Sequence, residues 1–201
     1  MRTAERLFAE QGIDSVSLRQ IGEATGMRMA GTVAYHFGDK DGLIRSIIDD
    51  RDARIDERRG AQLAELDRRG LTRDLRAVAE AGIRPAVEHI GETGYYFRFI
   101  AQLDRHPTAL SDAFASGAFG FASRILELQV EAGLDHLPPT ILEHRKRLAI
   151  HMVIGALADL EAQARGPVDE IVTLDLVDSV VTLYSAPPSP RTLEALSRME
   201  P

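Results

Sequence analysis

The first 50 residues divide into short helical segments whose ends are marked so closely that no segment can bury its apolar side alone. Residues 1–11 place apolar side chains on one helical face, and Gly12 follows as a stop. Ser17 and Gln20 form a capping-box pattern at the start of a second segment, which Gly26 ends. Helices this short are marginal in water without tertiary packing. We therefore expect the segments to pack on one another as one unit.

A third short segment is predicted over residues 30–37 and is closed by Gly38. Asp39 then caps a longer helix, whose apolar side consists of Leu43, Ile44, Ile47, Ile48 and Ile55. Three short helices joined by tight turns form the helix-turn-helix plan, in which the third helix enters the major groove of DNA. The sequence therefore predicts a helix-turn-helix domain over residues 1–46.

Beyond residue 56 the periodicity stays helical, first through a charged stretch that is either a continuation of the fourth helix or a linker. Further helices are predicted over residues 72–89, 92–106, 111–134, 138–166 and 168–185. The breaks between them are marked by Gly91, Pro107, Pro138-Pro139 and Gly166-Pro167. Aromatic residues make up only 5% of the chain and no segment alternates as a strand would. The predicted fold class is all-α, with residues 47–201 as a second, helical domain.

The side chains that the apolar stripes leave exposed in the first domain are donors and hydroxyls, which suit phosphates and base edges. They are Ser17, Arg19, Arg28, Thr32, Tyr35, His36 and Lys40. Against this, residues 1–50 contain six basic and eight acidic residues, so DNA binding requires the carboxylates to face away from DNA. The alternative is a compact three-helix unit that contacts other proteins.

Several spaced motifs occur within residues 3–48. They are Phe8-Ala9-Glu10-Gln11-Gly12, Ser17-Leu18-Arg19-Gln20-Ile21-Gly22, Gly26, Gly31-Thr32-Val33 and Tyr35-His36-Phe37-Gly38-Asp39-Lys40-Asp41-Gly42-Leu43. Together they resemble the N-terminal domain of the TetR family of transcriptional regulators. A set of spaced motifs is more specific than a single helix-turn-helix pattern.

The resemblance implies a DNA-binding head, a helical body with an effector pocket, and a homodimer formed through the last two long helices. It implies phosphate contacts from Ser17, Lys40 and Arg19, groove contacts from Tyr35 and His36, and base or phosphate contacts from Thr32 and Arg28. Most members of the family are repressors that a small molecule releases from DNA. The partners expected here are therefore double-stranded DNA with a palindromic operator, a small-molecule effector and a second copy of the chain.

The chain departs from the commonest pattern of that family in three ways. One more residue lies between Gly26 and Phe37, which changes the turn or the start of the recognition helix. Ala34 stands where many members have a tyrosine, which removes one expected contact. The sequence also begins almost at the first helix, without the basic arm and the extra helical turn that often precede it.

Most aromatic residues of the second domain fall in two stretches, residues 95–99 and 114–121. Together with nearby polar groups they are candidates to line a mainly apolar effector pocket. The candidates are Tyr95, Tyr96, Phe99, Gln102, His106, Phe114, Phe119, His151 and Met152. Aromatic residues at helical spacing are usually core residues, so simple packing is the alternative for each of them.

The helices predicted over residues 138–166 and 168–185 carry long apolar stripes. Leu148, Met152, Gly155, Ala156 and Leu160 lie along the first, and Val177, Val180, Val181 and Tyr184 along the second. Two such helices and their symmetry mates would form a four-helix bundle in a homodimer. Two recognition helices about 34 Å apart would then read a palindromic site. The alternative is that both stripes pack within one chain.

No catalytic motif of the GxGxxG, Walker, GxSxG or HExxH type occurs, so we expect no enzyme activity. The chain has no cysteine and therefore no thiolate metal site, and we expect neither a cofactor nor a resident metal. His144 and His151 lie seven residues apart beside Glu143. These residues leave a metal-dependent helical enzyme as the least favoured alternative.

The opening residues contain no apolar signal-peptide core, and no apolar run approaches the ~18 residues that would span a bilayer. We therefore expect a cytoplasmic protein without membrane contact. The leading hypothesis is a repressor in which effector binding shifts the helix that starts at Lys40 and changes the separation of the recognition helices. Its rival is a helical ligand-binding protein of the same fold that does not bind DNA.

Overall fold

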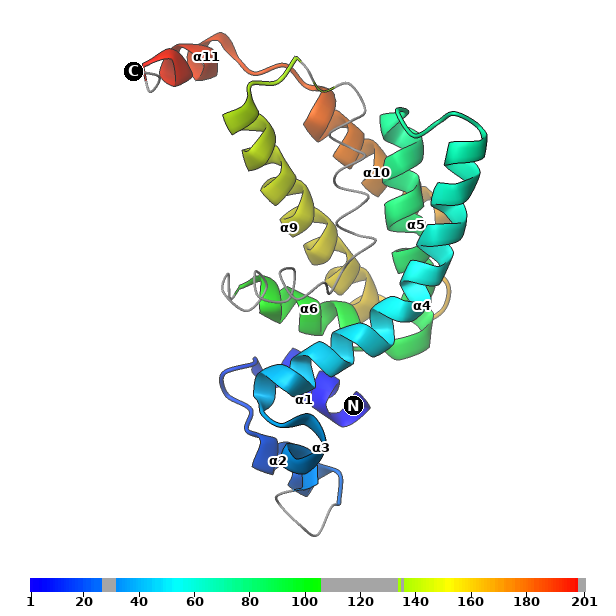
Figure 1. Cartoon of the computed structure of the whole chain (residues 1–201), viewed down its shortest axis with the longest axis vertical. Helices are drawn as coiled ribbons and strands as arrows, with labels where there is room; N and C mark the ends of the chain where they lie inside the picture. The colour runs from blue at the N-terminus through cyan, green and yellow to red at the C-terminus, as the bar shows by residue number, and fades with distance from the viewer. Residues whose placement is uncertain (27–31, 106–133, 135, 199–201) are drawn as a thin grey trace.

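In the computed structural model, which describes residues 1–26, 32–105, 134 and 136–198, the chain is an elongated assembly of helices (Figure 1). Three short helices form a head at one end, and longer helices pack side by side to form the body. The C-terminal helix lies at the end of the body farthest from the head. No strand occurs within the described ranges, and the all-α prediction is confirmed.

The head consists of α1 (Arg2–Gln11), α2 (Leu18–Ala24) and α3 (Thr32–Phe37). The body consists of α4 (Lys40–Arg68), α5 (Leu75–Thr93), α6 (Tyr96–Asp104), α9 (Pro139–Gln163), α10 (Glu170–Ser185) and α11 (Pro190–Ser197). Of the helix predicted over residues 111–134 the structure describes Leu134 alone, and the break at Pro107 lies outside the described residues. None of the helices that the structure describes is both long and apolar enough to cross a membrane.

Short polar side chains determine where several helices begin. Ser17 caps α2 and Gln20 completes the reciprocal capping box, which confirms that prediction. Asp39 caps α4, since its carboxylate accepts from the backbone N–H of Gly42 at 2.7 Å, again as predicted. The charged stretch after residue 56 is a continuation of α4 and not a linker.

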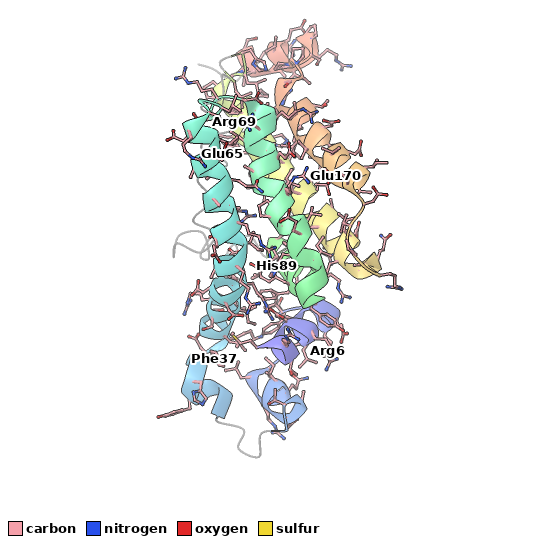
Figure 2. The ribbon with its side chains drawn as sticks, turned by 90° about the vertical axis from the view of Figure 1, so that its right-hand side faces the viewer. Arg6, Phe37, Glu65, Arg69, His89 and Glu170 are labelled. Atoms are coloured by element: carbon pink, nitrogen blue, oxygen red, sulfur yellow. The ribbon has the colours of Figure 1, made fainter. Side chains whose placement is uncertain are left out.

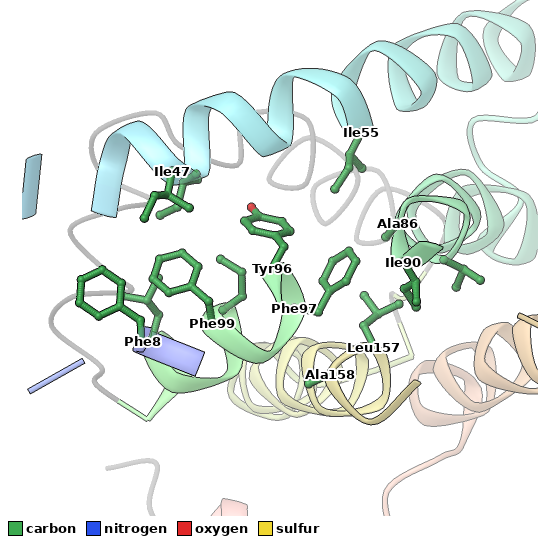
Figure 3. Close-up of a cluster of buried hydrophobic side chains, with 14 of the residues drawn as sticks. Phe8, Ile47, Ile55, Ala86, Ile90, Tyr96, Phe97, Phe99, Leu157 and Ala158 are labelled. Atoms are coloured by element: carbon green, nitrogen blue, oxygen red, sulfur yellow. The ribbon is translucent and has the colours of Figure 1, made fainter. Parts of the chain in front are cut away.

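One apolar core runs from the head into the body, and aromatic rings from α1 and α6 meet in it (Figure 3). Phe8 of α1 stacks on Phe99 of α6 with ring centroids 5.8 Å apart, and Tyr96 lies 6.4 Å from Phe99. All three side chains are fully buried, and Ile47 of α4 faces them. The head therefore shares its core with the body. The predicted domain division after residue 46 falls inside the unbroken α4, and this division stays a prediction.

A buried ion pair joins α1 to α4 beside this core. The Glu5 carboxylate accepts from Arg51 Nε at 2.5 Å and from Arg51 Nη2 at 2.9 Å. The side chains are only 1% and 5% exposed, respectively. Removing either partner would leave an uncompensated buried charge, which costs several kcal/mol. The pair therefore holds α1 in one orientation against α4.

The end of α5 differs from the prediction. Gly91 was expected to break the chain here, but α5 includes Gly91 and continues to Thr93. The helix ends at Gly94, which adopts the left-handed conformation with φ of 80°. A glycine inside a helix costs only about 1 kcal/mol relative to alanine, so tertiary packing can carry the helix past it. The prediction of a break at Gly91 is therefore wrong.

A residue from a distant helix takes the place of a capping side chain at the start of α6. Tyr95, the residue before this helix, makes no side-chain capping bond. Instead, the buried Glu161 of α9 accepts from the backbone N–H groups of Phe97 at 3.2 Å and Arg98 at 3.0 Å. Burial raises the pKa of Glu161 in spite of these bonds. The contact attaches α6 to α9.

The two stripes predicted for a dimer interface have different surroundings. Val177, Val180 and Tyr184 of α10 are fully buried within the chain, where α10 packs on α5 and α9. The alternative of packing within one chain therefore holds for these three residues. Figure 2 shows α5 between α4 and α10. On α9, by contrast, Leu148 is exposed and Met152 is only partly buried.

We expect Phe8→Ala to lower the free energy of unfolding by about 3–5 kcal/mol, because it removes a fully buried ring and leaves a cavity between α1 and α6. Urea unfolding followed by circular dichroism measures this change. The matched control is Leu193→Ala in the exposed helix α11, for which we expect a change within about 0.5 kcal/mol. Equal effects of the two substitutions would contradict the packing described for Phe8.

Candidate nucleic-acid interface

The short helix α3 presents two aromatic side chains to solvent. Tyr35 is 86% exposed and His36 is also exposed, and their rings meet edge to face with centroids 5.4 Å apart. Phe37, the next residue, is partly buried against the core and anchors the helix. Thr32 is the first residue of the same helix. The arrangement leaves Tyr35 and His36 available to a partner outside the chain.

Ser17 begins α2 with its hydroxyl group engaged in the capping box. Ser17 Oγ accepts from the backbone N–H of Gln20 at 3.3 Å and donates to the Gln20 side-chain oxygen at 2.7 Å. The backbone N–H of Ser17 donates to the same oxygen at 2.8 Å. Ser17 is exposed, but a phosphate would have to compete with Gln20 for its hydroxyl proton.

The two described cations of the predicted interface have partners within the head. Arg19 Nε donates to Glu23 at 2.8 Å, and both side chains are well exposed. Lys40 Nζ donates to the backbone carbonyl of Ile13 at 2.9 Å. Exposed ion pairs contribute little to stability, so Arg19 can exchange Glu23 for a phosphate at small cost. The Lys40 ammonium group has three donors and uses one of them on Ile13.

Gly42 determines how closely α3 approaches α4. A Cβ atom placed on Gly42 would lie 2.0 Å from the carbonyl oxygen of Phe37, at the end of α3. Between them, Gly38 adopts the left-handed conformation with φ of 76°. Any side chain at Gly42 would push α3 away from α4 and move Tyr35 with it. The residue therefore positions the exposed face of α3.

The residues predicted to line an effector pocket separate into two groups. Tyr96 and Phe99 are fully buried core residues, whereas Tyr95, Gln102, His151 and Met152 are partly buried or exposed. His151 Nδ1 lies 2.6 Å from a carboxylate oxygen of Asp104, and the Arg98 guanidinium lies 4.5 Å from the centre of the Tyr95 ring. His106, Phe114, Phe119 and the DNA-contact candidate Arg28 lie outside the described residues. An effector role for this set stays a prediction.

A groove of about 480 Å³ lies between the C-terminal half of α4 and the start of α5. Its lining is largely charged and includes Glu65 and Arg69, which Figure 2 places far from the head. It shares no residue with the predicted effector set.

In the part of the chain that the structure describes, no group of three or more histidine and carboxylate side chains is arranged to hold a metal ion. His144 and His151 are both exposed.

Reasoning from the sequence missed a buried polar contact where α4 crosses α6. The Tyr96 hydroxyl donates to Asp52 Oδ1 at 2.8 Å, and both side chains are buried. Burial raises the pKa of Asp52 from 3.8 to about 6 and raises the pKa of Tyr96 well above 10. The position of Asp52 between Ile48 and Ile55 on the apolar side of α4 could have indicated that this carboxylate faces inward.

Comparison with known proteins gives a family match at the N-terminal end and a relative that is similar over part of its length. Residues 1–47 match the family described as bacterial regulatory proteins, tetR family. The HTH-type transcriptional repressor AcnR of Corynebacterium glutamicum is 39% identical over 54 residues, which are 27% of this chain and 28% of that protein. The chain thus matches little more than a quarter of the relative's length, and the family match includes the head with Tyr35, His36 and Gly42.

We expect Gly42→Ala to destabilise the protein by about 1–3 kcal/mol, because the new methyl group collides with backbone that cannot rotate away. Thermal unfolding and amide hydrogen exchange in α3 would measure the loss. The matched control is Gly166→Ala, where a Cβ atom meets nothing within 4 Å and no positive φ is required. Unchanged thermal stability and unchanged amide hydrogen-exchange protection of α3 in Gly42→Ala would show that α3 does not approach α4 as closely as described.

Proposed function

We propose that this chain, whose residues 1–47 match the family described as bacterial regulatory proteins, tetR family, is a DNA-binding transcriptional regulator that acts as a repressor. The exposed aromatic pair on α3 is the observation that carries the proposal. Tyr35 is 86% exposed in a short helix whose next residue but one, Phe37, anchors it to the core. An exposed tyrosine beside an exposed histidine suits the major groove, because both offer hydrogen bonds and flat apolar surface to base edges.

The interface that we propose consists of Ser17, Arg19, Arg28, Thr32, Tyr35, His36 and Lys40. Within it, Arg19 and Lys40 supply the positive charge that phosphates require, once Arg19 leaves Glu23. Glu5, a carboxylate of the head, is neutralised by Arg51 in the interior and does not repel DNA at the surface. Burial of this charge removes part of the objection that the head is acidic overall.

We further propose that the protein acts as a homodimer on a palindromic operator, with α9 and α10 in the interface. Leu148 on α9 and Ile171 and Leu174 on α10 are exposed large apolar residues, which a second copy of the chain would cover in this dimer. A twofold axis at these helices would present both heads to one face of the duplex. A regulator of this kind acts where the chromosome lies, so the proposal places the protein in the cytoplasm.

Release from DNA by a small-molecule effector is the regulatory part of the proposal. Tyr95, Gln102, His151 and Met152 are the described candidates that lie partly or fully at the surface of the body. Effector binding among the body helices would move α4. The head would move with it, because α4 begins at Lys40, directly after α3. A coupling of about 1–3 kcal/mol would weaken DNA binding roughly 5- to 150-fold.

A second candidate function is a ligand-binding protein of the same fold without DNA binding. The observation in its favour is that Arg19 and Lys40 are both engaged inside the head, by Glu23 and by the Ile13 carbonyl. Fluorescence anisotropy with DNA from upstream of the protein's own gene, at several salt concentrations and beside a scrambled duplex, separates the two. Preferential binding that weakens steeply with salt supports the regulator, since phosphate contacts release counterions. No binding to any duplex at low salt supports the second candidate.

We expect Tyr35→Ala to weaken operator binding by about 0.5–1.5 kcal/mol, the usual net contribution of a hydrogen bond between uncharged groups, without changing protein stability. Anisotropy titration and thermal unfolding of the same samples measure both quantities. The companion Tyr35→Phe identifies the contact: a loss equal to that of Tyr35→Ala assigns it to the hydroxyl, and retained affinity assigns it to the ring. Normal operator binding by Tyr35→Ala would remove α3 from the interface.

We expect Leu148→Glu to raise the dimer dissociation constant at least about tenfold, because a twofold interface would bury two new carboxylates in an apolar contact. Sedimentation velocity over a range of concentrations measures the change. Leu193→Glu in α11 is the control, since Leu193 is 44% exposed and Leu148 is 42% exposed. Identical behaviour of the two variants would place the dimer contact away from Leu148.

A further inference from the structure

Two adjacent residues of α4 connect this helix to the head on one side and to the body on the other. Arg51 binds Glu5 of α1, and Asp52 accepts from the Tyr96 hydroxyl of α6 at 2.8 Å. The third side of this junction is the contact between α1 and α6, where Phe8 stacks on Phe99. The junction is thus a closed ring of three helices. Among the described contacts, the side between α4 and α6 contains one hydrogen bond, and the titratable Asp52 accepts it. A change at Asp52 therefore acts on that side of the ring.

The second oxygen of Asp52 is buried without a hydrogen-bond partner among the described residues. The charged and titratable groups that face the Asp52–Tyr96 contact come from three helices: Asp49, Arg51, Asp56 and Arg59 on α4, Tyr96 on α6, and His89 on α5, whose ring lies 6.4 Å from that of Tyr96. Arg59 lowers the pKa of Asp52 and the two neighbouring carboxylates raise it. Burial is the largest cause, and the pKa of Asp52 rises to about 6.

An ionised carboxylate with one oxygen unpartnered is costly to keep in the interior. Arrangements in which α4 and α6 separate slightly, so that water reaches this oxygen, lower that cost. A protonated carboxyl group has much less need of water and favours the closed arrangement. The state of a single proton therefore shifts the balance between a closed and a hydrated junction.

We propose that Asp52 and Tyr96 form a proton-sensitive positioning contact: loss of the charge on Asp52 tightens the junction of α4 with α6 and narrows the range of orientations that the head adopts relative to the body. Only the consequence for DNA rests on the proposed regulatory function. The positioning itself is a property of the folded chain.

The sign of the pH dependence follows from the direction of the shift. The folded protein binds a proton at Asp52 more readily than the unfolded chain does, because the pKa is about 6 in the folded state and 3.8 ordinarily. The contribution of Asp52 to stability therefore grows as the pH falls through 6 toward 4. Between pH 7.5 and pH 5 the unfolding equilibrium constant should fall roughly tenfold in the parent chain relative to Asp52→Asn.

The absence of cysteine allows the positioning to be measured directly. Spin labels are placed on Ala24→Cys in α2 and Thr182→Cys in α10, which are both exposed sites. Labelled protein is diluted into an excess of unlabelled protein, so that only distances within one chain are recorded. Pulsed electron paramagnetic resonance at pH 5.0 and pH 7.5 then gives the distribution of head-to-body distances without DNA.

We expect a distribution that broadens between pH 5.0 and 7.5 in the parent chain and stays narrow in Asp52→Asn at both values. Tyr96→Phe should move the midpoint of the broadening to higher pH, because the ionised Asp52 carboxylate loses the hydrogen bond from the Tyr96 hydroxyl. Asp159→Asn, the same substitution at an exposed site on α9, should behave as the parent.

Identical pH profiles of distance and stability in the parent chain and in Asp52→Asn would overturn the inference, as would an unmoved midpoint in Tyr96→Phe. None of these readouts contains DNA, so their failure is distinguishable from failure of the proposed function. If the protein binds an operator, the ratio of its affinities at pH 5.0 and 7.5 should differ between the parent chain and Asp52→Asn. An equal ratio in both would show that the junction does not reach the DNA-binding surface.

Discussion

The position of α1 between α4 and α6 is the constraint on which the arrangement of this protein depends. Phe8 supplies the apolar part of the contact, and the buried Glu5–Arg51 pair supplies the polar part. A buried ion pair recovers its desolvation cost only in one geometry, so it specifies an orientation more than it adds net stability. Because the same core continues into the body, movement of the head must deform this contact.

The parts of the fold that the sequence predicts well are those encoded by neighbouring residues. The capping box at Ser17, the cap at Asp39 and the apolar side of α4 depend on side chains a few positions apart, and all three are confirmed. The end of α5 was misplaced because two glycines lie three residues apart and only the left-handed turn, at Gly94, distinguishes them.

Contacts between distant segments account for what the sequence did not reveal about the candidate site. The exposure of Tyr35 follows from the apolar pattern of α3, but the bond of Lys40 to the Ile13 carbonyl joins residues 27 positions apart and has no local signature. In the same way, Glu161 and Asp52 occupy interior positions that helical periodicity allows but does not demand. A polar residue in an apolar stripe indicates that it has a hydrogen-bond partner in the interior, but the pattern does not identify that partner.

The close approach at Gly42 has a consequence for comparing this chain with its relatives. Every amino acid other than glycine carries a Cβ atom, and a Cβ atom at this position would lie 2.0 Å from the Phe37 carbonyl oxygen. All nineteen replacements therefore meet the same collision, and each must displace α3 relative to α4 whatever its polarity or charge. A glycine at the aligned position in divergent sequences would therefore indicate the same close approach of α3 to α4. It would carry no information about which DNA sequence each protein reads.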